Sequence, residues 1–459
     1  MARVFFLFRK IRSTYPVVRW EAAQGFVRRG DERTVGADKS GIRVIGKFHR
    51  PNKMIVAGFW IISLMLLPCD GGRYKAPHPS AVRFPYKRIP TLTELIEDGG
   101  YKHEEHEVVT EDGFILALHR IAPRGISSDN RGVPVLIVNG FAFQADGWLL
   151  LGNSSLPFVL TEMGYDVWLG DQRGNARSLR HVKYTADDLR LYNYTFHEQG
   201  IYDLPAFIDK IRDITGHDQI LYVGYSLSAG MLVVLNSERP EYNKKLLGAV
   251  MLAPAAHLRK WERNGLNYRA AISLVDATTT GQIQNRQWLL FGNIDLIKSL
   301  FVGACPVFPL NLLCQLSIAN LYGVSDGMEQ RYEFYQFGTV ATTVSVFVAE
   351  HLFQVVKNGD FAKYDYQSGN MNVYGQSTPP LYLFNRTTIP LNIVYGGNDN
   401  MVAPDAAERT SRDLKGAVMR KKYIKRFNHA DFLFSTTAPK NVYEDIVRFF
   451  DQLTNNNLQ

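Results

Sequence analysis

The sequence predicts an α/β fold, in which helices flank both faces of a mostly parallel sheet and a helical insertion interrupts it. Short apolar runs without polar alternation, typical of strands buried on both faces, occur at 134–140, 165–171, 220–226, 248–254 and 391–399. Helix-compatible segments separate the first four runs, as in βαβ units. With 459 residues and 46% hydrophobic content, the chain can bury such a core.

The run before the first of these strands predicts a hairpin, and the run after the fourth predicts the insertion. Residues 91–123 contain a short helix and two strand-like runs around the turn TEDG. Residues 255–379 are mostly helix-compatible and rich in apolar side chains. We therefore expect a core built from 91–254 and 380–459, interrupted by a helical cap that shapes a lipid pocket. Extra core packing explains this composition equally well.

The excess positive charge lies at the N-terminal end of the chain. Residues 1–53 contain 13 Lys/Arg and 4 Asp/Glu, a net charge of +9, whereas the whole chain carries +8. The remaining residues therefore sum to −1. The body of the protein gives no reason to expect a nucleic-acid partner.

An uncharged apolar run follows this basic extension and has the form of a targeting signal. The 16 residues between Lys53 and Asp70 would reach about 24 Å as a helix, short of the ~30 Å hydrocarbon core. This favours a secretory signal within 54–72 that is cleaved near its end, and a secreted or lysosomal location. The long lead-in leaves two alternatives open: Met54 is the true start, or residues 54–69 form an uncleaved membrane anchor.

The stretch VGYSLSAG contains a near match to the GxSxG turn that exposes a nucleophilic serine between a strand and a helix. Gly224 lies two residues before Ser226, but Ser228 replaces the second glycine. The strand-like ILYVGYS precedes this serine and a helix-like segment follows it. Ser226 is therefore the candidate nucleophile, with a plain strand-to-helix turn as the alternative.

A serine nucleophile needs a base and an orienting acid, which follow it in the order Asp, His in this architecture. Asp399 ends the predicted strand LNIVYGGND, and His429 lies in the loop FNHADF before the last predicted helix. We expect the backbone N–H groups of Leu227 and Phe141 to bind the oxyanion of the intermediate.

The sequence predicts no metal and no cofactor. His103 and His106 superficially resemble a zinc motif, but they are three residues apart in a predicted strand rather than four apart on a helix. His181 and His351 lie at no predicted strand end, so we assign them structural roles.

Features typical of a lumenal or extracellular protein occur along the chain. Cys305 and Cys314 enclose a short loop suited to a disulfide, while Cys69 lies near the predicted cleavage region. Glycosylation motifs begin at three asparagines: Asn153, Asn193 and Asn385.

Long segments of the chain, from about Thr91 to Phe450, resemble the acid lipases, the gastric and lysosomal group of α/β-hydrolases. The resemblance rests on YKHEEHEVVTEDGFILALHRI, GYDVWLGDQRGNARS, YDLPAFIDKI, AEHLFQVVKNGDFAKYDY, YGGNDNMVAPDAAERT and FNHADFLFSTTAPKNVYEDIV. It implies an α/β-hydrolase fold, the nucleophile, acid and base at Ser226, Asp399 and His429, and oxyanion donors at Phe141 and Leu227. The spacing of Cys305 and Cys314 is also similar to that of the gastric cap disulfide.

The chain departs from the family pattern beside these residues. The family usually has HGL where this chain has Asn139-Gly140-Phe141, GHSQG where it has GYSLS, and GNSRGN where it has GDQRGN. These replacements bear on the rate and on the substrate rather than on the identity of the reacting groups.

The leading hypothesis is a monomeric serine ester hydrolase that cleaves acylglycerols or sterol esters at a lipid–water interface through an acyl-enzyme. The departures keep a second hypothesis open, a catalytically weak lipid-binding or carrier protein with the same fold. An acyl transferase with the same triad is a third.

Overall fold

The computed structural model describes residues 89–123, 132–259, 266–292, 294–325, 327–328 and 333–456. The predicted basic extension (1–53) and the signal or anchor segment (54–72) lie outside the described residues, as does Cys69. Within the described ranges, no helix combines the length and the apolar character needed to cross a membrane.

The centre of the protein is a mostly parallel sheet with the order β1-β2-β4-β3-β6-β7-β10-β11, in which β5 also pairs with β2. The first two strands form an antiparallel hairpin, β2 pairs antiparallel with β4, and the pairs from β4 to β11 are parallel. Its strands are β1 (Tyr101–Val109), β2 (Phe114–Pro123), β3 (Pro134–Val138), β4 (Asp166–Asp171), β5 (Arg180–His181), β6 (Ile220–Tyr225), β7 (Leu246–Leu252), β10 (Leu391–Gly396) and β11 (Val418–Ile424). The α/β prediction, the N-terminal hairpin and the five predicted buried strands are therefore confirmed.

Burial explains why the sequences of the central strands do not alternate between apolar and polar residues. Every residue of β3, β4, β6 and β10 is buried, because helices cover both faces of the sheet. The edge strand β11 instead alternates between half-buried and exposed residues.

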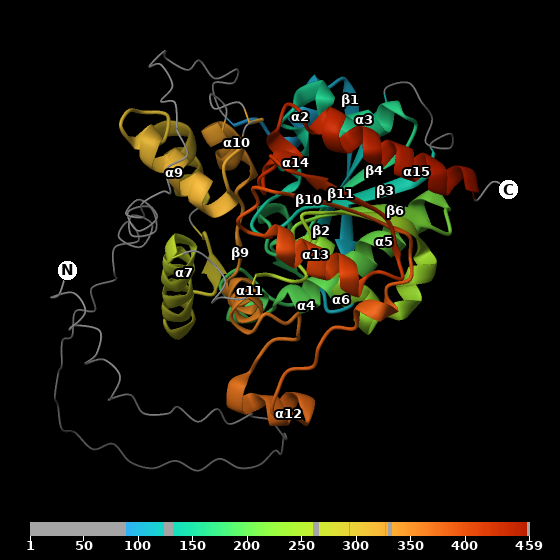
Figure 1. The fold of residues 1–459 in the computed structure, drawn as a ribbon. Coiled ribbons are helices and arrows are strands. Elements are labelled where there is room, and N and C mark those ends of the chain that lie inside the picture. Colours follow the sequence, from blue (N-terminus) through green and yellow to red (C-terminus); the bar gives the residue numbers. More distant parts are fainter. Residues whose placement is uncertain are drawn as a thin grey trace, which may run out of the picture. The chain divides into compact units, whose positions relative to one another are not determined.

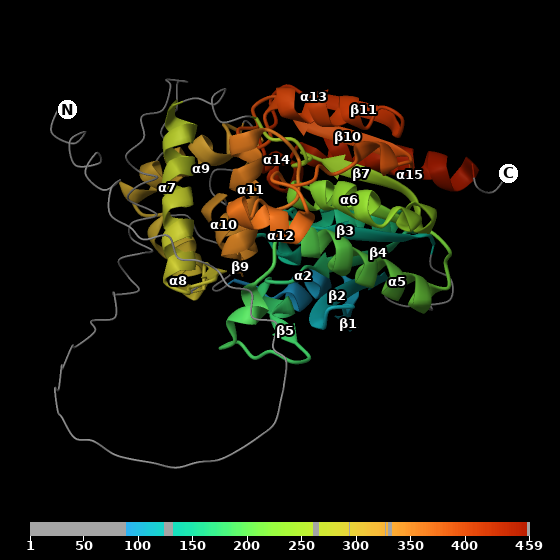
Figure 2. The ribbon, with the colours of Figure 1, turned by 90° about the horizontal axis from the view of Figure 1, so that it is seen from below.

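Helices form a layer on each face, as Figures 1 and 2 show. Apolar side chains of α5, α6 and α13 contribute to one core cluster, and those of α2, α3 and α15 contribute to the other. The helices are α2 (Leu92–Asp98), α3 (Leu156–Glu162), α4 (Phe196–Glu198), α5 (Leu204–Thr215), α6 (Leu227–Glu238), α7 (Leu266–Gln284), α8 (Ile294–Ser299), α9 (Leu310–Tyr322), α10 (Glu333–Val340), α11 (Val346–Asn358), α12 (Asn370–Tyr374), α13 (Pro404–Asp413), α14 (Asp431–Phe434) and α15 (Glu444–Asn456).

The segment between β7 and β10 is mainly helical, with one short strand pair, β8 (Leu289–Leu290) and β9 (Val344–Ser345). Figures 1 and 2 show α7, α9 and α10 beside the sheet rather than on its two faces. A disulfide joins Cys305, which precedes α9, to Cys314, which lies near the start of α9. The division of the chain into a core and a cap at 255 and 379 stays a prediction.

Candidate active site

Ser226 lies at a sharp turn between β6 and α6. Its backbone has φ 56° and ψ −115°, a conformation that is rare for a residue with a side chain and that costs about 1–3 kcal/mol. Gly224 makes the turn possible, because a Cβ there would lie 2.8 Å from the backbone nitrogen of Ala229. The strain and the close packing are those expected of a turn that projects a serine from the strand end.

Ser228 occupies the position of the missing glycine, and its hydroxyl is bound inside the turn. Its Oγ accepts a hydrogen bond from the Tyr225 N–H at 2.8 Å and donates to the Val138 carbonyl at 2.7 Å. The extra side chain is fully buried and links the ends of β6 and β3. The replacement therefore leaves the turn intact.

His429 lies between Ser226 and Asp399. Its Nε2 is 2.9 Å from the Ser226 Oγ, and its Nδ1 is 2.8 Å from the Asp399 Oδ2. All three side chains are buried. The other oxygen of Asp399 accepts two backbone N–H bonds from Met401 and Val402, at 2.9 and 2.8 Å. These bonds fix the carboxylate, which in turn orients the imidazole.

Two tyrosines hold the backbone of His429, and neither was identified from the sequence. The Tyr225 hydroxyl donates to the His429 carbonyl at 2.8 Å, and the Tyr322 carbonyl accepts from the His429 N–H at 3.0 Å. Burial raises the pKa of both phenols above its ordinary value, so both stay neutral. Tyr225 directly precedes the candidate nucleophile, a position that could have signalled this role, whereas Tyr322 comes from the distant α9.

The loop after β3 passes directly over Ser226. A Cβ on Gly140 would lie 2.8 Å from the Ser226 Cβ and 3.3 Å from its Oγ, so this close approach requires glycine. Phe141 is the next residue, and Leu227 is the first residue of α6, where helix N–H groups have no partner within the helix. Asn139 is fully buried, and neither side-chain polar atom has a hydrogen-bond partner within the described residues.

Side chains of the segment GDQRGN, which begins at the end of β4, support this loop. Asp171 accepts a hydrogen bond from the Ala145 N–H at 2.8 Å, and the Asn175 amide donates to the Phe143 carbonyl at 3.2 Å. The Gln172 amide also donates to the Gly140 carbonyl, at 3.4 Å. The sequence shows that Asp171 and Gln172 depart from the family pattern, but only the fold shows that they contact this loop.

The remaining predicted residues lie away from these contacts. The His181 Nε2 is 2.8 Å from the Asp112 carbonyl, and His351 is buried in a stack with Phe196, with ring centroids 3.7 Å apart. Both environments agree with structural roles. The three glycosylation-motif asparagines are all exposed: Asn153, Asn193 and Asn385. Their modification stays a prediction.

Comparisons with known proteins show the family of the chain. Residues 92–152 match the family described as partial alpha/beta-hydrolase lipase region, and residues 133–272 match the alpha/beta hydrolase fold. Lipase 1 of Drosophila melanogaster is 31% identical over 82% of this chain and 83% of its own. Gastric triacylglycerol lipase of Homo sapiens is 33% identical over 79% of this chain and 91% of its own. The chain belongs to the acid lipase family. It is therefore a lipase, a carboxylic ester hydrolase with the α/β-hydrolase fold.

Proposed function

We propose that this lipase hydrolyses acylglycerols or sterol esters, with Ser226 as nucleophile, His429 as base and Asp399 as orienting acid. The observation that carries the proposal is the continuous chain of contacts from Ser226 Oγ through His429 to Asp399, at 2.9 and 2.8 Å. Residues so placed can transfer a proton in each step of an acyl transfer.

The reaction proceeds through an acyl-enzyme. His429 Nε2 removes the Ser226 proton as Oγ forms a bond to the ester carbonyl carbon, and the N–H groups of Phe141 and Leu227 stabilise the oxyanion. The imidazolium then gives its proton to the leaving alkoxide, and the carbon–oxygen bond breaks. Water attacks the acyl-enzyme by the same route, and its proton passes through His429 to Ser226.

Apolar surface on the predicted cap supports a lipid–water interface as the partner. The loop closed by the Cys305–Cys314 disulfide carries Phe308, which is 71% exposed, and Val307, which is 56% exposed. Neighbouring exposed apolar side chains mark surfaces that contact apolar phases or partners. The disulfide also supports the proposed secreted or lysosomal location, because such bonds persist in oxidising compartments.

The proposal is tested by Ser226→Ala, assayed on a fluorogenic fatty-acyl ester. We expect kcat to fall by about 10⁴-fold or more, since the nucleophile is removed. Ser237→Ala is the matched control, because Ser237 is a second buried serine at the other end of α6. Unchanged turnover in Ser226→Ala would refute the proposal, and a folded wild type that binds fatty acids without turnover would instead support the carrier hypothesis.

A further inference from the structure

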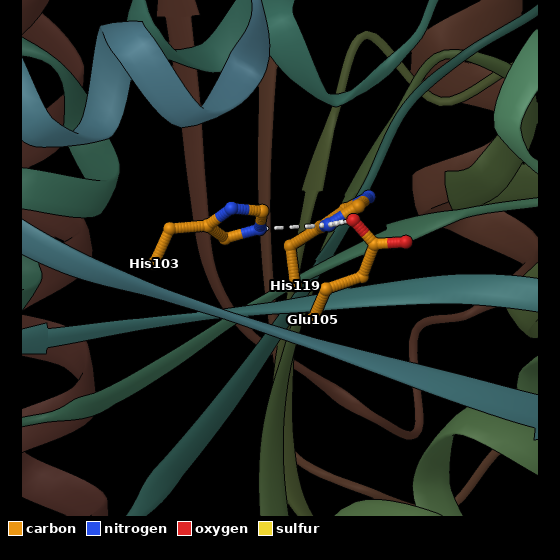
Figure 3. Close-up of side chains that lie close together, drawn as sticks. All are labelled: His103, Glu105 and His119. Atoms are coloured by element: carbon orange, nitrogen blue, oxygen red, sulfur yellow. Dashed lines mark hydrogen bonds and ion pairs between the residues drawn. The ribbon is translucent and has the colours of Figure 1, made fainter.

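The hairpin of β1 and β2 brings two histidines and a glutamate together on one face. Glu105 is directly opposite His119 in the hairpin register, and His103 precedes Glu105 by two residues. Residues two apart on a strand point to the same side of the sheet, so all three side chains share one face. Figure 3 shows the His119 ring between the side chains of His103 and Glu105.

The potential metal-binding atoms of these side chains converge. His103 Nε2 is 3.0 Å from His119 Nδ1, the Glu105 Oε2 is 3.9 Å from the same nitrogen, and all three atoms lie within 4.8 Å of one another. Zinc binds histidine nitrogen and carboxylate oxygen at about 2.0–2.2 Å, so one ion can reach all three after small side-chain rotations. Glu105 is exposed and His119 is fully buried, which gives the cluster an opening to solvent on one side.

The second nitrogen of each ring already has an oxygen partner. His119 Nε2 is 3.4 Å from the Asp171 Oδ2, and His103 Nδ1 is 2.9 Å from the Thr93 Oγ1. Histidines that bind metals almost always donate their other N–H to such a partner, which orients the ring and leaves the opposite lone pair for the ion. Here both outer partners are present without rearrangement of the backbone.

The local charges suit a divalent cation. The positive charge of Arg177 is balanced by its ion pairs with Asp171 and Asp146. The Glu105 carboxylate is then available to offset the charge of the ion.

We propose that His103, Glu105 and His119 form a zinc-binding site that joins β1 to β2. Three protein ligands leave one tetrahedral position for water. The ion would be structural, because the site contains none of the proposed catalytic groups. Through Asp171, it is linked to Ala145 in the loop that carries Phe141.

The test is zinc titration of the metal-free, untagged full chain by calorimetry, with Co²⁺ absorption as a report on tetrahedral geometry. We expect one ion per chain, an affinity about 100-fold weaker in His103→Asn, and an affinity about 10-fold weaker in Glu105→Gln. Zinc should also raise the Tm of the wild type, because it binds the folded state. These readouts do not depend on turnover.

His106→Gln is the matched control, since His106 lies on the same strand but on the opposite face, where it packs against Trp168. Its zinc affinity should equal that of the wild type. Glu105→Gln carries the test if His103→Asn does not fold, because Glu105 is exposed. The proposal is overturned if the wild type shows no zinc binding in a titration that extends to about 1 mM, which would detect any site with a Kd below about 1 mM. It is also overturned if the variants that fold bind zinc as tightly as the wild type.

Discussion

Two buried histidines, His429 and His119, each contact a carboxylate at the carboxyl end of a parallel strand, yet they are suited to different chemistry. His429 contacts Asp399 through Nδ1 and presents Nε2 to the Ser226 hydroxyl. His119 contacts Asp171 through Nε2 and presents Nδ1 to a second imidazole, that of His103. A hydroxyl supplies a proton to be moved, whereas a second imidazole and Glu105 supply lone pairs for a cation. The group that faces the second ring nitrogen therefore determines which chemistry a carboxylate–histidine pair supports.

The largest expected effect comes from removing the charge of Asp399. Asp399→Asn should lower kcat by about 10⁴-fold, because asparagine favours the wrong imidazole tautomer and cannot stabilise the imidazolium. The measurement is steady-state hydrolysis of a fatty-acyl ester. Ser237→Ala, the buried-serine control in α6, should leave turnover unchanged. A small effect of Asp399→Asn would mean that this carboxylate does not orient the base.

The corresponding change at the second pair is Asp171→Asn, which introduces the asparagine usual in the family pattern GNSRGN. We expect a zinc affinity about 10 to 100-fold weaker, because the outer partner of His119 loses its charge. Calorimetric titration measures this effect. Burial acts to raise the pKa of Asp171, but Arg177 and His119 outweigh it and hold the pKa well below its ordinary range. An unchanged affinity would remove Asp171 from the proposed site.

The hairpin and the strand ends differ in how far the sequence predicted them. The buried runs identified β3, β4, β6, β7 and β10. The order Ser, Asp, His, together with their positions after predicted strands, selected Asp399 and His429. The register of the hairpin could have placed His119 opposite Glu105, since the turn TEDG sets the pairing. The superficial resemblance to a zinc motif instead pairs His103 with His106, which point to opposite faces of β1.

Other features could not be predicted, because they depend on contacts between distant segments. Tyr322 reaches the His429 backbone from α9, and the Ser228 hydroxyl binds a carbonyl at the end of β3. A single sequence does not specify either contact. The sequence shows Ser228 as a departure from the motif, and only the fold shows the hydrogen-bond partners of its hydroxyl.

A third buried histidine, His351, contacts no carboxylate within the described residues and therefore shows the effect of burial without an acidic partner. Burial lowers its pKa to about 3, against the opposing effect of the Ala362 carbonyl beside its Nε2. The unfolded chain binds a proton below pH ~6.5 and the folded chain does not, so stability is lost as the pH falls from about 6.5 toward 3.

This loss gives a prediction for the pH dependence of unfolding. Between pH 7.5 and 5, His351 should reduce the free energy of unfolding by about 2 kcal/mol. In His351→Asn, this part of the pH dependence should disappear, even though the variant is less stable throughout. Denaturant unfolding at both pH values measures it. An identical pH dependence in the two proteins would show that His351 is not held neutral.

The smallest expected effect concerns Ser228. In Ser228→Ala, the Tyr225 N–H and the Val138 carbonyl lose their hydroxyl partner, so we expect a loss of about 1 kcal/mol in the free energy of unfolding. Denaturant unfolding monitored by tryptophan fluorescence measures this change. A variant as stable as the wild type would show that the hydroxyl does not support the turn.

Covalent labelling of the full chain with a fluorophosphonate probe tests whether Ser226 is an activated nucleophile. The probe reacts with a serine only when a base activates it. We expect one label, on the peptide that contains Ser226, with no label in Ser226→Ala and greatly slowed labelling in His429→Gln. A folded protein that stays unlabelled, or a label on another serine, would contradict this expectation.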